Sequence, residues 1–295
     1  MEIWIPITLS AAFFQNIRFL LQKQLTGTLS TLGVTFARFL FAAPLALVLA
    51  FALTRGAGWP EMPPVFWAFA VSGGIAQILA TALVVHLFSL RNFAVGLTFS
   101  KTETVTTALL SALLLGEWLT PAAQGAILIT VAGVAVMSAP PGVQWIQGML
   151  SRAAGLGILA GAIFSMSSVG YRGAALSLSH GSFYTRAAVV LAMVTLLQSV
   201  LMALWLVWRE PGQVQRVVSG WRRTALVGLF SALGSFGWFS AFALVNAAWV
   251  KALGQVEIVF NTLTSILVFG ERLTAREALG ITLVLVGALT LILTS

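Results

Sequence analysis

The sequence predicts an all-α integral membrane protein with ten transmembrane helices, arranged as two inverted-topology five-helix repeats around a central cavity. Three observations support this prediction: the composition, the series of long apolar segments, and a short polar motif that occurs twice. The chain has 295 residues, of which 59% are hydrophobic and only 8% are charged. An average soluble domain has about a quarter charged residues. This composition therefore indicates a chain whose surface faces lipid.

Ten apolar segments follow one another, each close to the roughly 20 residues that cross a bilayer core as a helix. Runs such as LALVLAFAL do not alternate between apolar and polar residues, which excludes the strands of a membrane β-barrel. The first segment lacks a basic region before it, so we expect a retained helix and not a signal peptide. The segments are Ile3–Leu21, Leu32–Leu53, Val65–Leu87, Val95–Leu115, Ala122–Ser138, Ala154–Ala175, Tyr184–Trp208, Thr224–Val245, Val250–Phe269 and Ala278–Leu293.

The motif Gly-Glu-x-Leu-Thr ends the fourth and the ninth segment, and its glutamates, Glu117 and Glu271, stand 154 residues apart. A similarity at fixed spacing indicates an internal repeat. Because each half holds five segments, an odd number, the second half must enter the membrane from the opposite side. We expect one repeat at residues 1–139, a second at 150–295 and a linker at 140–149. At the same offset Asn92 matches Asn246, Glu103 matches Glu257, and Gly133 matches Gly287.

Locally, the motif is typical of a turn between two helices. Thr120 followed by Pro121 has the pattern of an N-cap residue with proline at the first helical position. Glu117 and Glu271 are therefore expected at opposite membrane surfaces. There they either finish turns and meet backbone N–H groups or a nearby arginine, or they take part in gating.

The duplicated pattern, with this motif after the fourth and ninth segments and a glycine, Gly133 or Gly287, in the helix that follows each, resembles the EamA family of the drug/metabolite transporter superfamily. The resemblance covers nearly the whole chain. It implies a multi-pass carrier of the bacterial inner membrane that exports amino acids or related metabolites by alternating access, with the aromatic amino acid exporters as a candidate branch. The superfamily also includes exchangers of phosphorylated and nucleotide-linked metabolites, so the resemblance leaves the substrate open.

Ionisable residues inside apolar segments are candidates for a functional site, because their burial in lipid is costly. Glu103 and Glu257 lie in the N-terminal halves of their segments, where the helix dipole favours a carboxylate. Lys101 points to another face than Glu103, so each is expected to meet a partner on another helix. We expect Lys101 to bind the carboxylate of an amino acid, while Glu103 or Glu257 binds its ammonium group or carries a coupling proton. The alternative is a set of salt bridges that only hold the helices together.

Further polar and aromatic residues complete the predicted substrate-binding set. The histidine among them either shuttles a proton or forms an interfacial hydrogen bond. The two arginines either reach toward the head groups or bind substrate. The aromatic residues either hold a substrate side chain, or they face lipid or pack in the core. The set comprises Gln15, Asn16, Gln77, His86, Phe99, Trp238, Ser240, Gln255, Arg38 and Arg186.

Several functions are excluded by what the sequence lacks. It has no cysteine and no aspartate, and it has only two histidines and no metal-protease or P-loop motif, so we expect neither an enzyme nor a cofactor or metal. Without a P-loop, transport must draw on an ion gradient or on exchange. The expected partners are a small-molecule substrate, the lipid bilayer and a coupling proton, with a monomeric chain and no nucleic acid despite the net charge of +8. A channel and a structural membrane protein are the alternatives of another class.

Basic residues are distributed unevenly between the two sides of the predicted bundle. The loops on the side of the chain ends are expected to hold Arg55, Arg172 and Lys251, whereas the loops on the other side are expected to hold nine lysines and arginines. The positive-inside rule therefore predicts that the chain ends lie outside the cytosol, although the resemblance implies cytosolic ends.

Overall fold

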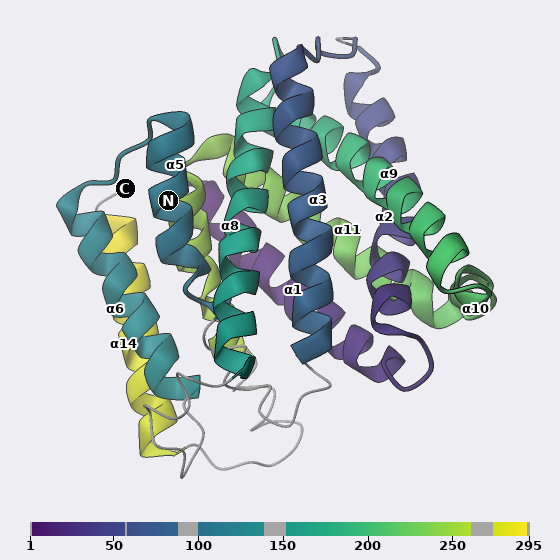
Figure 1. Cartoon of the computed structure of the whole chain (residues 1–295). Helices are drawn as coiled ribbons and strands as arrows, with labels where there is room; N and C mark the ends of the chain where they lie inside the picture. The colour runs from purple at the N-terminus through teal and green to yellow at the C-terminus, as the bar shows by residue number, and fades with distance from the viewer. Residues whose placement is uncertain (1, 57, 88–99, 139–151, 261–273, 294–295) are drawn as a thin grey trace.

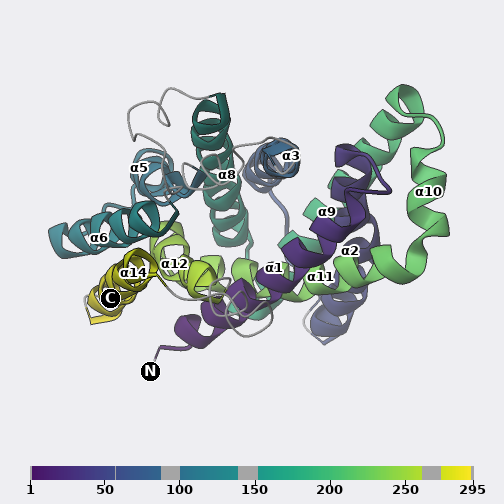
Figure 2. The same cartoon turned by 90° about the horizontal axis from the view of Figure 1, so that it is seen from below.

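The computed structural model describes residues 2–56, 58–87, 100–138, 152–260 and 274–293. These residues form α-helices joined by short turns (Figure 1), which confirms the all-α prediction for this part of the chain. The start of α1 and the end of α14 lie near one another in Figures 1 and 2. The helices are α1 (Trp4–Leu25), α2 (Thr31–Thr54), α3 (Pro64–Leu87), α5 (Glu103–Leu115), α6 (Pro121–Ser138), α8 (Arg152–Ser177), α9 (Phe183–Arg209), α10 (Gln213–Ser219), α11 (Trp221–Leu244), α12 (Ala247–Gly254) and α14 (Ala275–Leu293).

Five of these helices, α2, α3, α8, α9 and α11, are long and apolar enough to cross a membrane. Each has 24 to 27 residues, compared with the roughly 20 that span a hydrocarbon core. Shorter apolar helices lie in α5, α6 and α14. The protein is therefore a multi-pass helical membrane protein. The predicted count of ten spans stays a prediction, because the fourth and ninth predicted segments lie partly outside the described residues.

The ends of several helices follow from local sequence signals. The hydroxyl of Ser30 accepts a hydrogen bond from the N–H of Gly33 at the start of α2 (3.0 Å), and Ser182 caps α9 in the same way. The hydroxyl of Thr120 accepts from the N–H of Ala123 (3.3 Å), so the predicted cap before Pro121 is confirmed. Gly116 ends α5 in the left-handed conformation, with φ 69°, which glycine adopts without strain.

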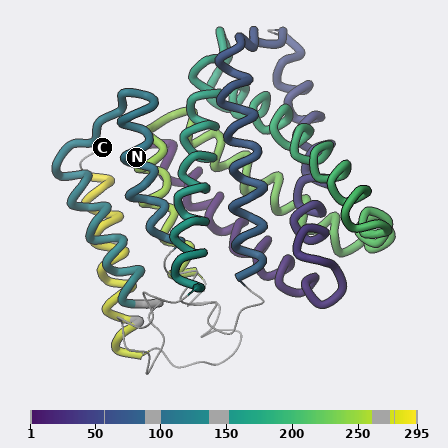
Figure 3. Tube along the Cα trace, viewed as in Figure 1, coloured from purple at the N-terminus to yellow at the C-terminus, as the bar shows by residue number. Residues whose placement is uncertain are grey.

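The helices pack mainly in pairs that join the first part of the chain to the second. α3 packs along α8, α1 along α11, α2 along α9, and α6 along α14. Figure 2 shows α6 beside α14 and α3 beside α8. In Figure 3 the same pairs are neighbouring tubes, with α6 in teal beside α14 in yellow and α3 in blue beside α8 in green. The largest buried cluster collects apolar side chains from both parts of the chain. The interface between the two parts is thus a large share of the core.

Gly133 and Gly287 allow the close approach of α6 and α14. A Cβ atom at Gly287 would lie 2.8 Å from the carbonyl oxygen of Ala126, and one at Gly133 would lie 2.8 Å from the carbonyl oxygen of Gly280. Real Cβ atoms do not approach backbone atoms so closely. Both positions therefore require glycine for the helices to keep their present spacing.

We predict that Gly287→Ala destabilises the protein by about 1–3 kcal/mol, because the added methyl group must push α14 away from α6. Gly125→Ala is the matched control, since Gly125 lies in α6, the helix that packs against α14, but has no atom of another segment within 4 Å of an added Cβ. The control should be neutral or stabilising by up to about 1 kcal/mol, from helix propensity alone. Thermal unfolding of both variants in detergent tests this. A Gly287→Ala variant as stable as the control would contradict the packing.

Candidate functional site

Two helices are interrupted immediately before the glutamates that the repeat relates. In the first half the helical conformation gives way to a turn at Lys101 and Thr102, and α5 then begins at Glu103. In the second half α12 ends at Gly254, and helix resumes at Val256 after a turn at Gln255. Each carboxylate thus lies at the start of a helical segment, where the helix dipole favours a negative charge. Interrupted helices in membrane proteins are tolerated where they line a cavity or a binding site.

The two glutamates form ion pairs with lysines from the other half of the chain. Oε2 of Glu103 lies 3.4 Å from Nζ of Lys251, and Oε2 of Glu257 lies 3.8 Å from Nζ of Lys101. The four side chains are between 4% and 19% exposed, so water screens these pairs weakly. Lys101 and Glu103 do not pair with each other, and each meets a partner from another helix, as their spacing predicts. We call Lys101, Glu103, Lys251 and Glu257 the crossed ion pairs.

Polar and aromatic side chains surround the crossed ion pairs. The side-chain amide of Gln15 donates to Oε2 of Glu257 (2.8 Å), and the amide of Gln255 donates to the hydroxyl of Thr104 (2.9 Å). Nζ of Lys251 lies 5.3 Å from the ring centre of Trp238 and 5.7 Å from that of Phe164, within the range of cation–π attraction. The structure therefore brings together six of the predicted residues: Lys101, Glu103, Glu257, Gln15, Gln255 and Trp238.

α8 supports the interruption in the first half. The hydroxyl of Ser165 donates to the carbonyl oxygen of Glu103 (2.8 Å). A Cβ atom at Gly161 would lie 2.6 Å from the carbonyl oxygen of Ser100. The absence of a side chain at Gly161 thus lets α8 pack directly against the turn, and Ser165 gives the carbonyl oxygen of Glu103 a partner within the protein.

Lys251 lies inside the predicted segment 250–269, but it was left out of the predicted substrate-binding set. It was also assigned to a loop on the side of the chain ends, which was wrong: it lies in α12 and its side chain is 13% exposed. Its position at the start of the predicted segment 250–269 was the available signal. At the repeat offset Lys251 corresponds to Leu97, so the repeat itself did not mark it. Thr104, Phe164 and Ser165 had no distinguishing signal in the sequence.

Arg38 and Gln77 belong to neighbouring polar contacts between helices. Arg38 is 4% exposed, and its guanidinium donates to the hydroxyls of Ser231 (3.1 Å) and Thr81 (3.0 Å). Of the two alternatives for Arg38, contact with the head groups or binding of substrate, the first is therefore wrong. The amide oxygen of Gln77 accepts hydrogen bonds from Tyr171 and Gln198, each at 2.9 Å.

The remaining predicted residues are not joined to the crossed ion pairs by any hydrogen bond or ion pair that the structure gives. Asn16 and Ser240 are buried. Arg186 is half-buried in the first turn of α9, and His86 is half-buried in the last turn of α3. Phe99 lies outside the described residues.

Glu117 of the repeated motif forms a further ion pair between the two halves. Nε of Arg172 donates to both carboxylate oxygens of Glu117, at 2.7 and 2.8 Å, and its Nη1 donates to the carbonyl oxygens of Phe242 and Val245 (2.6 Å each). The expectation of a nearby arginine is thus confirmed for Glu117. Arg172 was expected in a connecting loop, which was wrong: it is 8% exposed within α8. Glu271 lies outside the described residues.

The fold and the site together define a class: a multi-pass helical membrane protein whose buried charged groups meet between the two parts of the chain. The chain belongs to the EamA-like transporter family, whose family model matches residues 2–139 and again residues 151–293. The family resemblance seen in the sequence is therefore confirmed.

Two comparisons show what else the chain is similar to. A Lactiplantibacillus plantarum protein named "Putative sugar uptake protein" is 31% identical over 130 residues, which are 43% of this chain and 44% of that protein. The chain thus matches less than half the length of this curated relative. A solved structure titled "Crystal structure of protein" matches 99% of this chain and 98% of its own, with a TM-score of 0.72 and 20% identity. At this identity the likeness shows the fold alone.

We predict that Arg172→Ala destabilises the protein by about 3 kcal/mol, because it leaves the Glu117 carboxylate and two carbonyl groups without their partner. Arg55→Ala is the control, since Arg55 is exposed and surface substitutions of this kind usually have small effects. Arg172→Lys should fall between them, because lysine keeps the charge but not the bidentate geometry. Thermal unfolding in detergent is the measurement, and equal stability of Arg172→Ala and Arg55→Ala would contradict the prediction.

Proposed function

We propose that this protein is a secondary transporter that exports amino acids, or similar small amphiphilic metabolites, by alternating access. The observation that carries the proposal is the set of crossed ion pairs, which holds two ammonium groups and two carboxylates inside a membrane protein. A zwitterionic substrate brings one group of each sign. The site therefore offers the carboxylate and the ammonium group of the substrate each a partner of opposite charge.

Binding of a zwitterion exchanges one ion pair for another. The substrate carboxylate takes the place of Glu257 at Lys101, and the ammonium group binds Glu103 or Glu257. The empty site keeps its charges paired, and the occupied site pairs them with substrate, so neither state leaves a buried charge uncompensated. The rings of Trp238 and Phe164, which already lie beside Lys251, are placed to contact an apolar substrate side chain.

The proposed architecture is ten transmembrane helices in two inverted repeats, residues 1–139 and 150–295, joined by residues 140–149. The packing pattern supports it. If α1 corresponds to α8 and α3 to α11, the contact of α1 with α11 is equivalent to that of α8 with α3. If α2 also corresponds to α9 and α6 to α14, the contact within each of these two pairs is its own equivalent. A two-fold axis in the membrane plane produces such a pattern.

Alternating access requires contacts between the halves that break when one side opens. The pair of Glu117 and Arg172 is suited to this role, because it joins the turn after α5 to α8 and to the last carbonyl groups of α11. We propose that the pair forms in the state in which this side of the protein is closed, and that it breaks when this side opens. A proton on Glu257 would release Lys101 and so couple transport to a pH gradient.

A second candidate is the exchange of phosphorylated or nucleotide-linked metabolites, and one observation favours it. Arg18 and Arg38 are 3% and 4% exposed, and Nε of Arg18 has no hydrogen-bond partner. Among the described residues, Arg18 is attracted by the carboxylate of Glu257, which already pairs with Lys101, and is repelled by the like charge of Arg38. Cations thus outnumber carboxylates in this region of the described chain, which suits a ligand with additional negative charge.

We predict saturable uptake of neutral amino acids into proteoliposomes and a loss of about 10- to 100-fold in kcat/KM for Lys101→Ala, the range expected for one charged hydrogen bond. Lys23→Ala, at an exposed position, is the control and should transport normally. The panel includes sugars and sugar phosphates. Flux of phosphates alone would favour the second candidate, and conductance without saturation would indicate a channel. Amino-acid flux that is indifferent to Lys101→Ala would remove Lys101 from the site.

We further predict that one of two variants, Glu103→Gln or Glu257→Gln, abolishes the dependence of flux on a pH gradient while retaining exchange of substrate for substrate. Exchange requires no net proton movement, whereas gradient-driven flux requires a carboxylate that is protonated and deprotonated in each cycle. Both variants are compared with wild type in the same vesicles, with and without the gradient. Full gradient dependence in both variants would contradict proton coupling through these carboxylates.

A further inference from the structure

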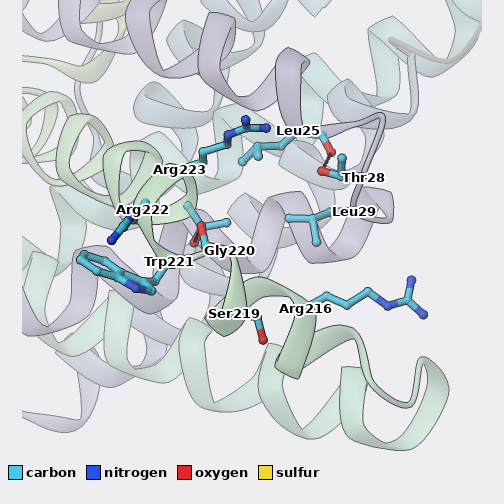
Figure 4. Close-up of a pocket in the computed structure, with 10 residues that line it drawn as sticks. Leu25, Thr28, Leu29, Arg216, Ser219, Gly220, Trp221, Arg222 and Arg223 are labelled. Carbon is cyan, nitrogen blue, oxygen red and sulfur yellow. Dashed lines mark hydrogen bonds between the residues drawn. The ribbon is translucent and has the colours of Figure 1, made fainter.

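A basic pocket of about 680 Å³ lies where α10 meets the start of α11 and the turn after α1 (Figure 4). Three arginines, Arg216, Arg222 and Arg223, line it, and the lining contains no acidic residue. Leu25 and Leu29 add an apolar wall. The other lining residues are Thr28, Ser219, Gly220, Trp221 and Thr224.

The pocket lies at the ends of two apolar helices, where the head groups of a surrounding bilayer are expected. α9 ends at Arg209 and α11 begins at Trp221, so both of these apolar helices leave the membrane beside it. Trp208 and Trp221 are 70% and 57% exposed. The guanidinium of Arg209 lies 4.9 Å from the ring centre of Trp208, and that of Arg222 lies 5.9 Å from the ring centre of Trp221. Exposed tryptophans together with arginines are typical of the membrane interface.

The three arginines are not neutralised within the part of the chain that the structure describes. All three are exposed, and no described carboxylate forms an ion pair with Arg216, Arg222 or Arg223. The neighbouring acidic residue, Glu210, accepts a hydrogen bond from Ser30 at the start of α2 and does not line the pocket. The pocket is therefore a site of positive charge that an anion can fill.

We propose that this pocket binds the head group of an anionic phospholipid. Guanidinium groups bind phosphate oxygens in bidentate fashion, so three arginines around one pocket suit a phosphodiester. A lipid also accounts for the exposed ring of Trp221 (57% exposed), because the glycerol backbone and first methylene groups of the lipid would cover this ring. A soluble phosphate would leave it in water.

A lipid in this pocket would connect parts of both halves of the chain. Thr28 and Leu29 belong to the turn between α1 and α2, whereas Arg216 belongs to α10, and Arg222 and Arg223 to the start of α11. Clusters of basic residues at the ends of membrane helices attract the anionic lipids of the cytoplasmic leaflet. The pocket therefore places this end of α11 at an anionic leaflet. This inference requires a membrane-embedded chain and is independent of the transported substrate.

The test compares the retention of phosphatidylglycerol and phosphatidylcholine by the purified full-length protein, measured by native mass spectrometry. Wild type should retain phosphatidylglycerol selectively. The variant Arg216→Gln/Arg222→Gln/Arg223→Gln should bind it on the order of 100-fold more weakly, since each basic residue near an anionic surface contributes roughly fivefold and the three factors multiply. The control is Arg55→Gln/Arg152→Gln/Arg209→Gln, which removes the same charge from exposed residues outside the pocket lining. It should retain the lipid as wild type does.

Three outcomes would overturn the proposal. Wild type that retains both lipids equally has no anionic lipid site. An equal loss in the two triple variants means that net charge and not this pocket attracts the lipid. If excess inorganic phosphate displaces phosphatidylglycerol from the wild type, and the pocket variant no longer binds phosphate, then the pocket is a site for free phosphate. Should the pocket variant fail to fold, the wild-type comparison of the two lipids still decides.

Discussion

The pairing of each buried glutamate with a lysine from the other half of the chain is the constraint on which the rest of this structure depends. A carboxylate inside a membrane protein costs several kcal/mol unless it is paired and hydrogen-bonded. Glu103 finds its partner in Lys251, and Glu257 finds its partner in Lys101. The site therefore exists only when the two halves are packed together. The interrupted helices position both glutamates at helix starts, and α8 packs against one interruption through Gly161 and Ser165.

The same constraint applies at the repeated motif. The bidentate pair of Glu117 and Arg172 again joins one half to the other, and the arginine also satisfies two carbonyl groups near the end of α11. Arg172 stands 154 residues after Arg18, which is the offset that relates Glu103 to Glu257. Both arginines are buried, so the repeat includes these cations in the first helix of each half. An architecture held by ion pairs between halves can exchange one set of pairs for another without exposing a bare charge to lipid.

Local patterns predicted the parts of the fold that local interactions determine. The cap at Thr120 and the glycine end of α5 lie where the repeated motif predicts a turn between two helices. The repeat offset identified Glu103 and Glu257, and the cost of burying charge identified Lys101. The contacts of Lys251 and Arg172 escaped prediction because their partners lie 55 to 148 residues away along the chain. Lys251 has no cationic equivalent in the first half, and Arg172 lies near the end of the predicted segment 154–175.

A double-mutant cycle of Glu103→Gln and Lys251→Met tests the central claim most directly, with thermal unfolding in detergent as the measurement, because it needs no knowledge of the substrate. If the two residues compensate each other, each single variant leaves an unpaired buried charge and loses stability, whereas the double variant recovers most of the loss. The expected coupling is about 1–3 kcal/mol. Strictly additive losses would show that Glu103 and Lys251 do not depend on each other, and would contradict an architecture held by crossed ion pairs.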